Sequence, residues 1–293
     1  MRKTRHFIAL LLALVFVLTA CGNSGQEPAN SDSQKESEAQ SQAPSEKADK
    51  KPAGEQTIVL GVSPKPHAEI AEVVIPLLAK EGIKLELKTF DDYVIPNKAL
   101  AAGDIDANYF QHLPYLEEFA KDNKLSLASI GGVHIEPLAI YSAKYKSLKE
   151  LPDGAKIIIP NDVTNGARAL LLLEKEGYIK LDDPTNLKAT EMNITENPHN
   201  FTFIPMEAPS IPRQYQGVDA AAINSNYAID SGLNPVKDGL VIEDKENPYA
   251  NIIAVRQGEE NEEKFQKLLK AFQSEEVKKF IEERYQGAVI PAF

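Results

Sequence analysis

The sequence has no tryptophan and only one cysteine, Cys21, among its 293 residues. A single cysteine excludes an intrachain disulfide and any CxxC metal or redox motif. Basic residues are also in deficit, because 32 Lys and Arg stand against 43 Asp and Glu, which gives a formal net charge of −11. Binding of nucleic acid needs a basic face, so this charge balance argues against nucleic acid as a partner.

The short motifs of several large enzyme classes are missing as well. The sequence contains no GxSxG, no HExxH, no P-loop and no GxGxxG pattern. These patterns mark the nucleophile, the metal ligands or the phosphate-binding backbone of their enzymes. We therefore expect a protein that is not an enzyme and that needs no cofactor.

The N-terminus reads as an export signal. Three basic residues precede an apolar run at 7–18, which is too short to span a bilayer comfortably. The run ends in LeuThrAlaCysGly (18–22), which resembles the lipobox of bacterial lipoproteins. In that family the cysteine thiol is diacylated, the peptide is then cut before the cysteine, and the new amine is acylated. The resemblance implies a signal peptide at 1–20, a lipidated Cys21 and a lipid-anchored protein on the extracytoplasmic face of the cell membrane.

The next segment is depleted in residues that build a core. Residues 22–56 contain no aromatic residue and no Val, Ile, Leu or Met. Such a chain cannot bury enough apolar surface to offset its loss of conformational entropy. We expect 21–56 to be a disordered tether between the lipid anchor and a folded body.

The folded body begins at residue 57 with alternating strand and helix patterns. Strand patterns are expected at 57–62, 84–90, 126–130, 134–142, 156–160, 201–205, 218–224 and 251–256. Helical periodicity separates them and closes the chain at 260–273 and 275–285. Alternation of this kind indicates an α/β fold with parallel strands. We expect two α/β lobes, the first made of 57–142 and 251–293 and the second of 143–250.

One stretch, 89–115, is dense in groups that recognise small molecules. The ring side chains Tyr93, Phe110, His112 and Tyr115 are interleaved with polar residues where a strand ends. Ligands of open α/β sheets bind beyond the carboxyl ends of strands, in clefts lined by rings and a few polar groups. Burial in a core is the alternative for each of these rings.

Several motifs in this order resemble one family. They are PheAspAspTyrValIleProAsnLysAlaLeu (90–100), GlyAspIleAspAlaAsnTyrPheGlnHisLeuProTyrLeu (103–116), IleProAsnAspValThrAsn (159–165) with Arg168, GluAlaProSerIleProArg (207–213), AlaAlaIleAsnSerAsnTyrAla (221–228) and GluAspLysGluAsnProTyrAlaAsn (243–251). Together, behind a lipobox, they resemble the methionine-binding lipoproteins of ABC importers, the NlpA or MetQ family. The resemblance implies a type II periplasmic-binding fold with the ligand cleft between two lobes. It also implies L-methionine as ligand and an importer permease and ATPase complex as partner.

The residue types suit a free amino acid. Arg168 can donate two parallel bonds to a carboxylate. It falls in the first turn of a helix that Thr164 or Asn165 would cap, where a cation opposes the positive end of the helix dipole. The position makes more sense if an anion lies beside the arginine. Asn224 and Asn251 can accept from the ammonium, and the four rings can enclose the thioether. On this view, replacement of Arg168 weakens binding strongly and affects folding far less.

Three alternatives stay open on the sequence alone. The ligand can be D-methionine or a methionine-containing dipeptide, since the depth of the pocket depends on the tertiary structure. A metal-binding importer lipoprotein would use His67, His112 and His134. No two of these histidines have the close spacing of metal ligands, and His134 and His199 belong to no motif. We therefore expect no metal site.

Overall fold

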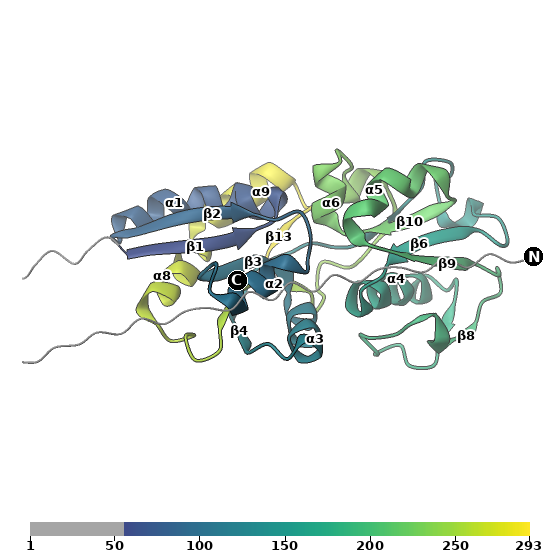
Figure 1. Cartoon of the computed structure of the whole chain (residues 1–293). Helices are drawn as coiled ribbons and strands as arrows, with labels where there is room; N and C mark the ends of the chain where they lie inside the picture. The colour runs from purple at the N-terminus through teal and green to yellow at the C-terminus, as the bar shows by residue number, and fades with distance from the viewer. Residues whose placement is uncertain (1–55) are drawn as a thin grey trace, which may run out of the picture. The chain divides into compact units, whose positions relative to one another are not determined.

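The structure, a computed structural model, describes residues 56–293 (Figure 1). The expected signal peptide, the lipidated Cys21 and the tether up to residue 55 lie outside the described residues. Across residues 56–293 we find no helix with both the length and the apolar character needed to span a membrane. The α/β class expected from the sequence is confirmed, in the form of two large sheets with helices on both faces of each.

The first sheet has six strands in the order β13-β4-β12-β3-β1-β2. We call this sheet and its helices the first lobe. Its strands are β1 (Gln56–Val62), β2 (Ile83–Thr89), β3 (Ala107–His112), β4 (Leu127–Ile135), β12 (Ala250–Arg256) and β13 (Ile290–Pro291). β1, β2 and β3 run parallel, as expected, whereas β12 is antiparallel to both β3 and β4. The sheet is therefore mixed, because the chain returns from the second sheet in the opposite direction.

The strand pattern of β1 explains how both faces of this sheet are covered. Ile58, Leu60 and Val62 point into the larger core, which helices α1 (Glu69–Lys80), α8 (Glu263–Phe272) and α9 (Glu275–Tyr285) close. Val59, one position out of phase, packs with a smaller core under α2 (Ile95–Ala102) and α3 (Leu113–Asn123). Alternate residues of a strand face opposite sides of a sheet. A strand buried on both sides therefore reads as an almost continuous apolar run.

The second sheet has five strands in the order β11-β5-β10-β6-β9. We call it, with its helices, the second lobe. Its strands are β5 (Ala139–Tyr141), β6 (Lys156–Pro160), β9 (Thr202–Met206), β10 (Ala220–Ile223) and β11 (Gly239–Ile242). β6 lies parallel to β9 and β10, while β5 is antiparallel to β10 and β11. A two-stranded ribbon, β7 (Lys180–Leu181) with β8 (Ile194–Glu196), extends from this lobe.

The second lobe is also covered on both faces. In β6, Ile157 and Ile159 face the core under α4 (Val163–Lys175), and Ile158 faces the opposite core. That opposite core is closed by α5 (Ile211–Gln214) and α6 (Ser225–Asp230), and α7 (Pro235–Asp238) follows before β11. Single helical turns complete the chain: η1 (Pro64–Ala68), η2 (Leu148–Glu150), η3 (Glu191–Asn193), η4 (Ala208–Ser210) and η5 (Tyr215–Gly217).

The chain crosses between the lobes twice, at 136–138 and at 243–249. The sequence pattern predicted one strand over 134–142 in the first lobe, and this was wrong. Pro137 has no N–H to donate, the strand stops before it, and β5 pairs in the second sheet instead. β11 was missed, because its four residues are all only half-buried and show no alternation.

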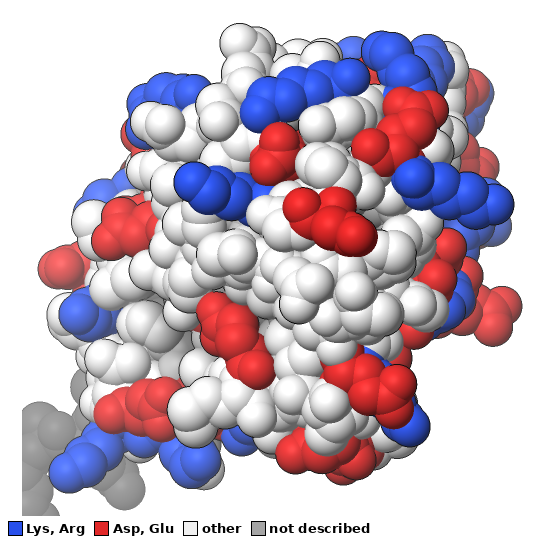
Figure 2. All heavy atoms as spheres, turned by 90° about the vertical axis from the view of Figure 1, so that its right-hand side faces the viewer, with Lys and Arg blue, Asp and Glu red and all other residues white. Residues whose placement is uncertain are grey.

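Charged side chains of both signs are interspersed on the end face of the second lobe (Figure 2). Acidic and basic groups alternate across this view rather than gathering by sign. A polyanion needs a contiguous basic surface. This face therefore does not have the character of a nucleic-acid-binding surface.

Candidate functional site

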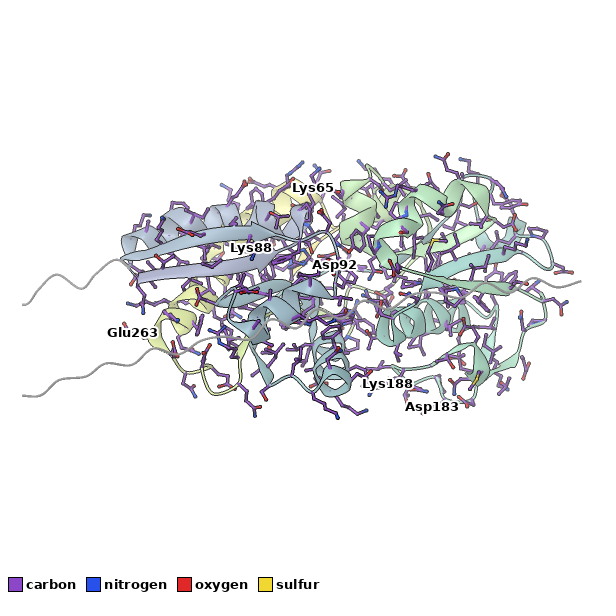
Figure 3. All side chains as sticks on the ribbon, in the orientation of Figure 1. Lys65, Lys88, Asp92, Asp183, Lys188 and Glu263 are labelled. Atoms are coloured by element: carbon purple, nitrogen blue, oxygen red, sulfur yellow. The ribbon has the colours of Figure 1, made fainter. Side chains whose placement is uncertain are left out.

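One cavity gathers all seven ligand-contacting residues expected from the sequence. It lies between the two lobes, and about 330 Å³ of empty space, its open mouth included, separates its walls. The first lobe and the first crossover contribute Tyr93, Phe110, Gln111, His112, Tyr115, Glu136 and Asn251, and the second lobe contributes Asn165, Arg168, Asn224, Ser225 and Asn226. Ion pairs outside this cavity join the lobes as well, namely Lys65 with Asp230 at 3.9 Å and Lys188 with Glu118. Figure 3 labels both lysines.

One end of the cavity is aromatic. The ring of Tyr93 lies 6.0 Å from Phe110 and 5.7 Å from Tyr115, centroid to centroid, and Phe110 lies 6.3 Å from Tyr115. The Tyr115 hydroxyl donates to the carbonyl of Tyr93 at 3.0 Å. The Tyr93 hydroxyl donates across the lobes to Asn226 Oδ1 at 2.6 Å. These bonds hold the ring faces in place while their polar tips stay satisfied.

His112 sits where β3 gives way to α3. Its Nδ1 accepts from the backbone N–H of Tyr115 at 3.1 Å, which caps the helix. The ring proton must therefore be on Nε2, which donates to Asn165 Oδ1 at 3.0 Å. Burial, with the nearby charge of Arg168, lowers the pKa of His112 to about 3. His112 is thus a neutral donor that connects the two lobes.

Asn165 is a hub that the sequence motif contained but that sequence reasoning did not assign to the site. Its Oδ1 accepts from His112, from Arg168 Nη1 at 3.1 Å and from Asn224 Nδ2 at 2.9 Å. Its Nδ2 donates to the carboxylate of Asp162. Asp162 also caps α4, so the cap is not Thr164 or Asn165 as expected. Arg168 consequently lies in the second turn of α4, where the helix dipole acts only weakly.

The fork of Arg168 is already engaged by the protein. Nε donates to Glu243 Oε1 at 2.9 Å and Nη2 donates to Glu243 Oε2 at 2.6 Å. Nη2 also donates to the backbone carbonyl of Glu136 at 2.9 Å, and the guanidinium stacks 4.3 Å from the ring centre of Tyr249. The two parallel bonds that we expected a ligand carboxylate to receive from this fork are made to Glu243 in this structure. One Nη1 N–H remains after the bond to Asn165.

The polar end of the cavity offers acceptors. Asn224 Oδ1 is buried and has no hydrogen-bond partner among the described residues. Glu136, on the first crossover, lines the cavity, and burial raises its pKa. Sequence reasoning missed Glu136. The sequence feature that could have identified it is IleGluPro (135–137), where an acidic residue follows the apolar residues of a strand pattern and directly precedes a proline.

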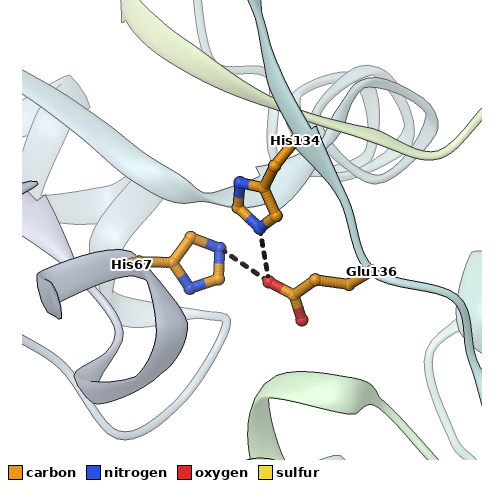
Figure 4. Close-up of side chains that lie close together, drawn as sticks. All are labelled: His67, His134 and Glu136. Atoms are coloured by element: carbon orange, nitrogen blue, oxygen red, sulfur yellow. Dashed lines mark hydrogen bonds and ion pairs between the residues drawn. The ribbon is translucent and has the colours of Figure 1, made fainter. Parts of the chain in front are cut away.

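A buried histidine network lies behind this polar end, made of Tyr109, His134, Glu136, His67 and Asn251. His134 Nε2 lies 2.7 Å and His67 Nε2 lies 3.2 Å from the same carboxylate oxygen, Glu136 Oε1 (Figure 4). His67 Nε2 also lies 3.0 Å from Asn251 Oδ1, and the Tyr109 hydroxyl contacts His134 Nδ1. Sequence analysis grouped His67 and His134 only in the metal-binding alternative and connected neither with Asn251, which is 184 positions from His67.

Ligand atoms of His67, His134 and Glu136 lie within 4.8 Å of one another, as in a set that could hold a metal ion. His134 Nε2 hydrogen-bonds to Glu136 Oε1 at 2.7 Å, whereas His67 Nε2 hydrogen-bonds to Asn251 Oδ1 and approaches Glu136 Oε1 at 3.2 Å. With Glu136 ionised, both Nε2 atoms must be protonated to donate, and a protonated nitrogen does not ligate a metal. The arrangement therefore fits a hydrogen-bond network better than a metal centre.

The buried histidines predict that acid destabilises the fold. Burial lowers the pKa of His67 from 6.5 to about 4 and that of His134 to about 3. The pKa of His112 is likewise lowered to about 3. Below pH 6.5 the unfolded chain binds protons that the folded chain does not. The free energy of unfolding should fall by up to ~1.4 kcal/mol per pH unit for each histidine as pH drops from 6.5 toward 4. Glu136 opposes this loss in part, because its raised pKa makes the folded state bind a proton first.

Urea unfolding at pH 7.5, 6.0 and 5.0 measures this dependence. His199→Asn is the matched control, because its side chain is exposed on the second lobe, and it should leave the slope unchanged. A urea midpoint that does not move between pH 7.5 and 5.0 would contradict the prediction.

Known proteins resemble this chain over its described length. A family model described as NlpA lipoprotein matches residues 58–293. The methionine-binding lipoprotein MetQ of Bacillus subtilis (strain 168) is 43% identical over 289 residues, covering 97% of this chain and 96% of that protein. A solved nutrient binding protein from Burkholderia cenocepacia bound to methionine is 43% identical with a TM-score of 0.78, covering 80% of this chain and 100% of that one. An ABC transporter periplasmic substrate-binding protein from Coxiella burnetii is 39% identical with a TM-score of 0.77, with the same coverage.

Proposed function

This chain belongs to the NlpA lipoprotein family, and we infer from that membership and from its cavity that it is the substrate-binding lipoprotein of an ABC importer. It captures L-methionine and delivers it to the membrane transporter. Its two mixed α/β lobes with the cavity between them have the architecture of type II periplasmic-binding proteins.

The observation that carries this function is the division of the cavity into two ends. Rings of Tyr93, Phe110 and Tyr115 line one end, and donors and acceptors line the other. A thioether gains ~0.3–1.5 kcal/mol from contact with an aromatic ring. An amino acid with an unbranched apolar side chain fits both ends at once.

We propose that the ligand carboxylate is bound by single N–H groups from two residues rather than by one fork. Arg168 Nη1 and Asn224 Nδ2 each have one N–H left after their bonds to Asn165 Oδ1. Both belong to the second lobe, and their shared acceptor fixes their separation. Arg168 thus supplies charge and one hydrogen bond, while Glu243 keeps it in place.

We propose that the ligand ammonium binds Glu136, Asn224 Oδ1 and Asn251. Asn224 Oδ1 is a buried acceptor without a partner among the described residues, which is unfavourable by about 1–3 kcal/mol unless a donor reaches it. The carboxylate of Glu136 supplies the charge that an ammonium needs when it leaves water. Asn251 comes from the strand that returns to the first lobe, so the ligand joins both lobes.

Competition against labelled L-methionine tests the two-ended cavity. Norleucine replaces sulfur by a methylene and should lose about 1 kcal/mol, the sulfur–ring contribution. Alanine should lose several times more, at ~0.8 kcal/mol per missing CH₂-sized group plus the cost of a void. Methionine sulfoxide should lose roughly 1–3 kcal/mol, because its oxygen finds no spare donor among the rings. If alanine displaces the label with the same potency as norleucine, the rings do not enclose the ligand side chain and are only part of the hydrophobic core.

The same assay separates the remaining alternatives. D-methionine exchanges the positions of the ammonium and the side chain, and a methionine-containing dipeptide lengthens the ligand at one end. A metal ion as cargo is favoured only by the close approach of His67, His134 and Glu136. If Zn²⁺ displaces the label as potently as unlabelled L-methionine does, or if a dipeptide binds more tightly than L-methionine, the assigned ligand changes.

We propose that the chain acts at the membrane surface and not as an enzyme. Its relatives are named as lipoproteins and binding proteins. The proposed anatomy is a signal peptide at 1–20, a lipidated Cys21, a tether to residue 56 and two lobes that contact the permease and ATPase complex.

The lipid anchor makes a direct prediction. Cys21→Ser removes the sulfur that the acyl chains need, and we expect the variant to stay uncleaved and unlipidated. Each buried CH₂ of an acyl chain contributes ~0.8 kcal/mol to membrane binding, so the wild type should stay in the membrane fraction. Mass spectrometry of the purified wild-type N-terminus measures the acylation. A mature protein without acyl mass on Cys21 would disprove the anchor.

A further inference from the structure

We propose that His67 and His134 are positioning residues of the ammonium site, which hold the Glu136 carboxylate charged and turn its second oxygen toward the cavity. This inference rests on the proposed capture of an amino acid. Neither histidine lines the cavity, so each acts through Glu136 and not by touching the ligand. Figure 4 shows both rings directed at one oxygen of Glu136 while its other oxygen points away from them.

The proton positions follow from the contacts. An ionised carboxylate oxygen only accepts, so both Nε2 atoms carry the ring protons. In His134 this leaves Nδ1 to accept from the Tyr109 hydroxyl, and the phenol thereby selects the tautomer. In His67 the Nε2–H donates to Asn251 Oδ1 at 3.0 Å and lies 3.2 Å from Glu136 Oε1, so one ring contacts two of the proposed ammonium acceptors.

Neutral donors have an advantage that a lysine or arginine would not have at this place. Burial lowers the pKa of His67 to about 4 and of His134 to about 3, so both rings are uncharged at neutral pH. Two neutral N–H groups stabilise the carboxylate without placing a cation beside the incoming ammonium. A cationic partner would neutralise Glu136 and repel the ligand.

The surrounding charges agree with this assignment. The titratable groups that face Glu136 are His67, His134, Arg168, Tyr93, Tyr109, Tyr227 and Tyr285. Arg168 is the cation among them, and the carboxylate of Glu243 balances it at 2.6 Å. The negative charge of Glu136 is therefore left for the ligand.

The test pairs two variants of one residue with two ligands. His134→Leu removes the N–H donor, whereas His134→Gln keeps an N–H at similar reach. The ligands are L-methionine and 4-(methylthio)butanoate, which keeps the carboxylate and the thioether but lacks the amino group. Calorimetry on the purified protein gives the affinity for both, between pH 5.5 and 8.

His134→Leu should weaken methionine binding by about 10- to 100-fold, the loss of one charge-assisted hydrogen bond. It should leave 4-(methylthio)butanoate within about threefold of its wild-type affinity. The acid limb of methionine binding should move to higher pH, because a carboxylate without its donors ionises less readily. His134→Gln should restore both properties, and the matched pair His67→Leu and His67→Gln should behave alike.

Equal losses for both ligands would show a merely structural role and overturn the proposal, as would full methionine affinity in His134→Leu. Should that variant not fold, Tyr109→Phe removes only the phenol that selects the tautomer, and it should cause a smaller loss that is specific for methionine. No change in Tyr109→Phe would also overturn the proposal.

Wild-type protein that binds neither ligand would instead refute the proposed function. If a chelator lowers the methionine affinity of the wild type and Zn²⁺ restores it, His67, His134 and Glu136 form a metal site and not a hydrogen-bond network.

Discussion

Arg168→Ala should lower the free energy of unfolding by about 3–5 kcal/mol, because it leaves the Glu243 carboxylate, whose side chain is only 10% exposed, without its cationic partner. The guanidinium bonds to both crossovers, through the Glu243 carboxylate and the Glu136 carbonyl. Removing it frees the two segments that join the lobes. Methionine affinity should fall as well, by about 10- to 100-fold for the lost Nη1 bond. Urea unfolding and calorimetry measure the two effects.

This large expected effect on folding is the opposite of the prediction from the sequence alone, which was that replacement of Arg168 affects binding strongly and folding far less. An exposed arginine–glutamate pair provides the matched control, since Arg284 pairs with Glu69 but its side chain is 54% exposed, against 3% for Arg168. Arg284→Ala should cost less than about 1 kcal/mol. If Arg168→Ala unfolds at the same urea concentration as the wild type, Glu243 is not held as the contacts indicate.

Glu136→Gln should weaken methionine binding by about 2–5 kcal/mol, roughly 30- to 4,000-fold, because it removes the charged partner of a buried ammonium. The amide keeps one oxygen for His67 and His134, so the network can persist. The fold should be as stable as the wild type or more stable at neutral pH. Burial raises the pKa of Glu136, so its ionised form is unfavourable for folding above that pKa, and the amide removes this cost.

Opposite effects on binding and folding separate a ligand contact from a structural one. Glu86→Gln, an exposed position of β2, is the control and should change neither property. The preference for methionine over 4-(methylthio)butanoate should nearly vanish in Glu136→Gln. Retention of methionine affinity within about threefold would exclude Glu136 from the ammonium site.

Local patterns determined most of the secondary structure and much of the cavity. The helix expected at 275–285 is found with the same bounds, and Ser274 caps it as an N-terminal serine should. The rings of 89–115 were identified because aromatic and polar residues alternate where a strand ends. Each of these signals is carried by residues within a few positions of one another, so periodicity and capping chemistry can report them.

Only the tertiary structure decided how the polar groups are shared. Arg168 and Glu243 are 75 positions apart, and Tyr93 and Asn226 are 133 apart. A carboxylate 75 positions away leaves no trace in the sequence around an arginine. For this reason Arg168 suggested a ligand clamp while its fork was in fact engaged by Glu243. Glu136 likewise became an acceptor of the cavity only because Pro137 ends a strand there and sends the chain into the second sheet. The two crossovers bring these distant groups together, and long-range packing, not local propensity, sets their distances.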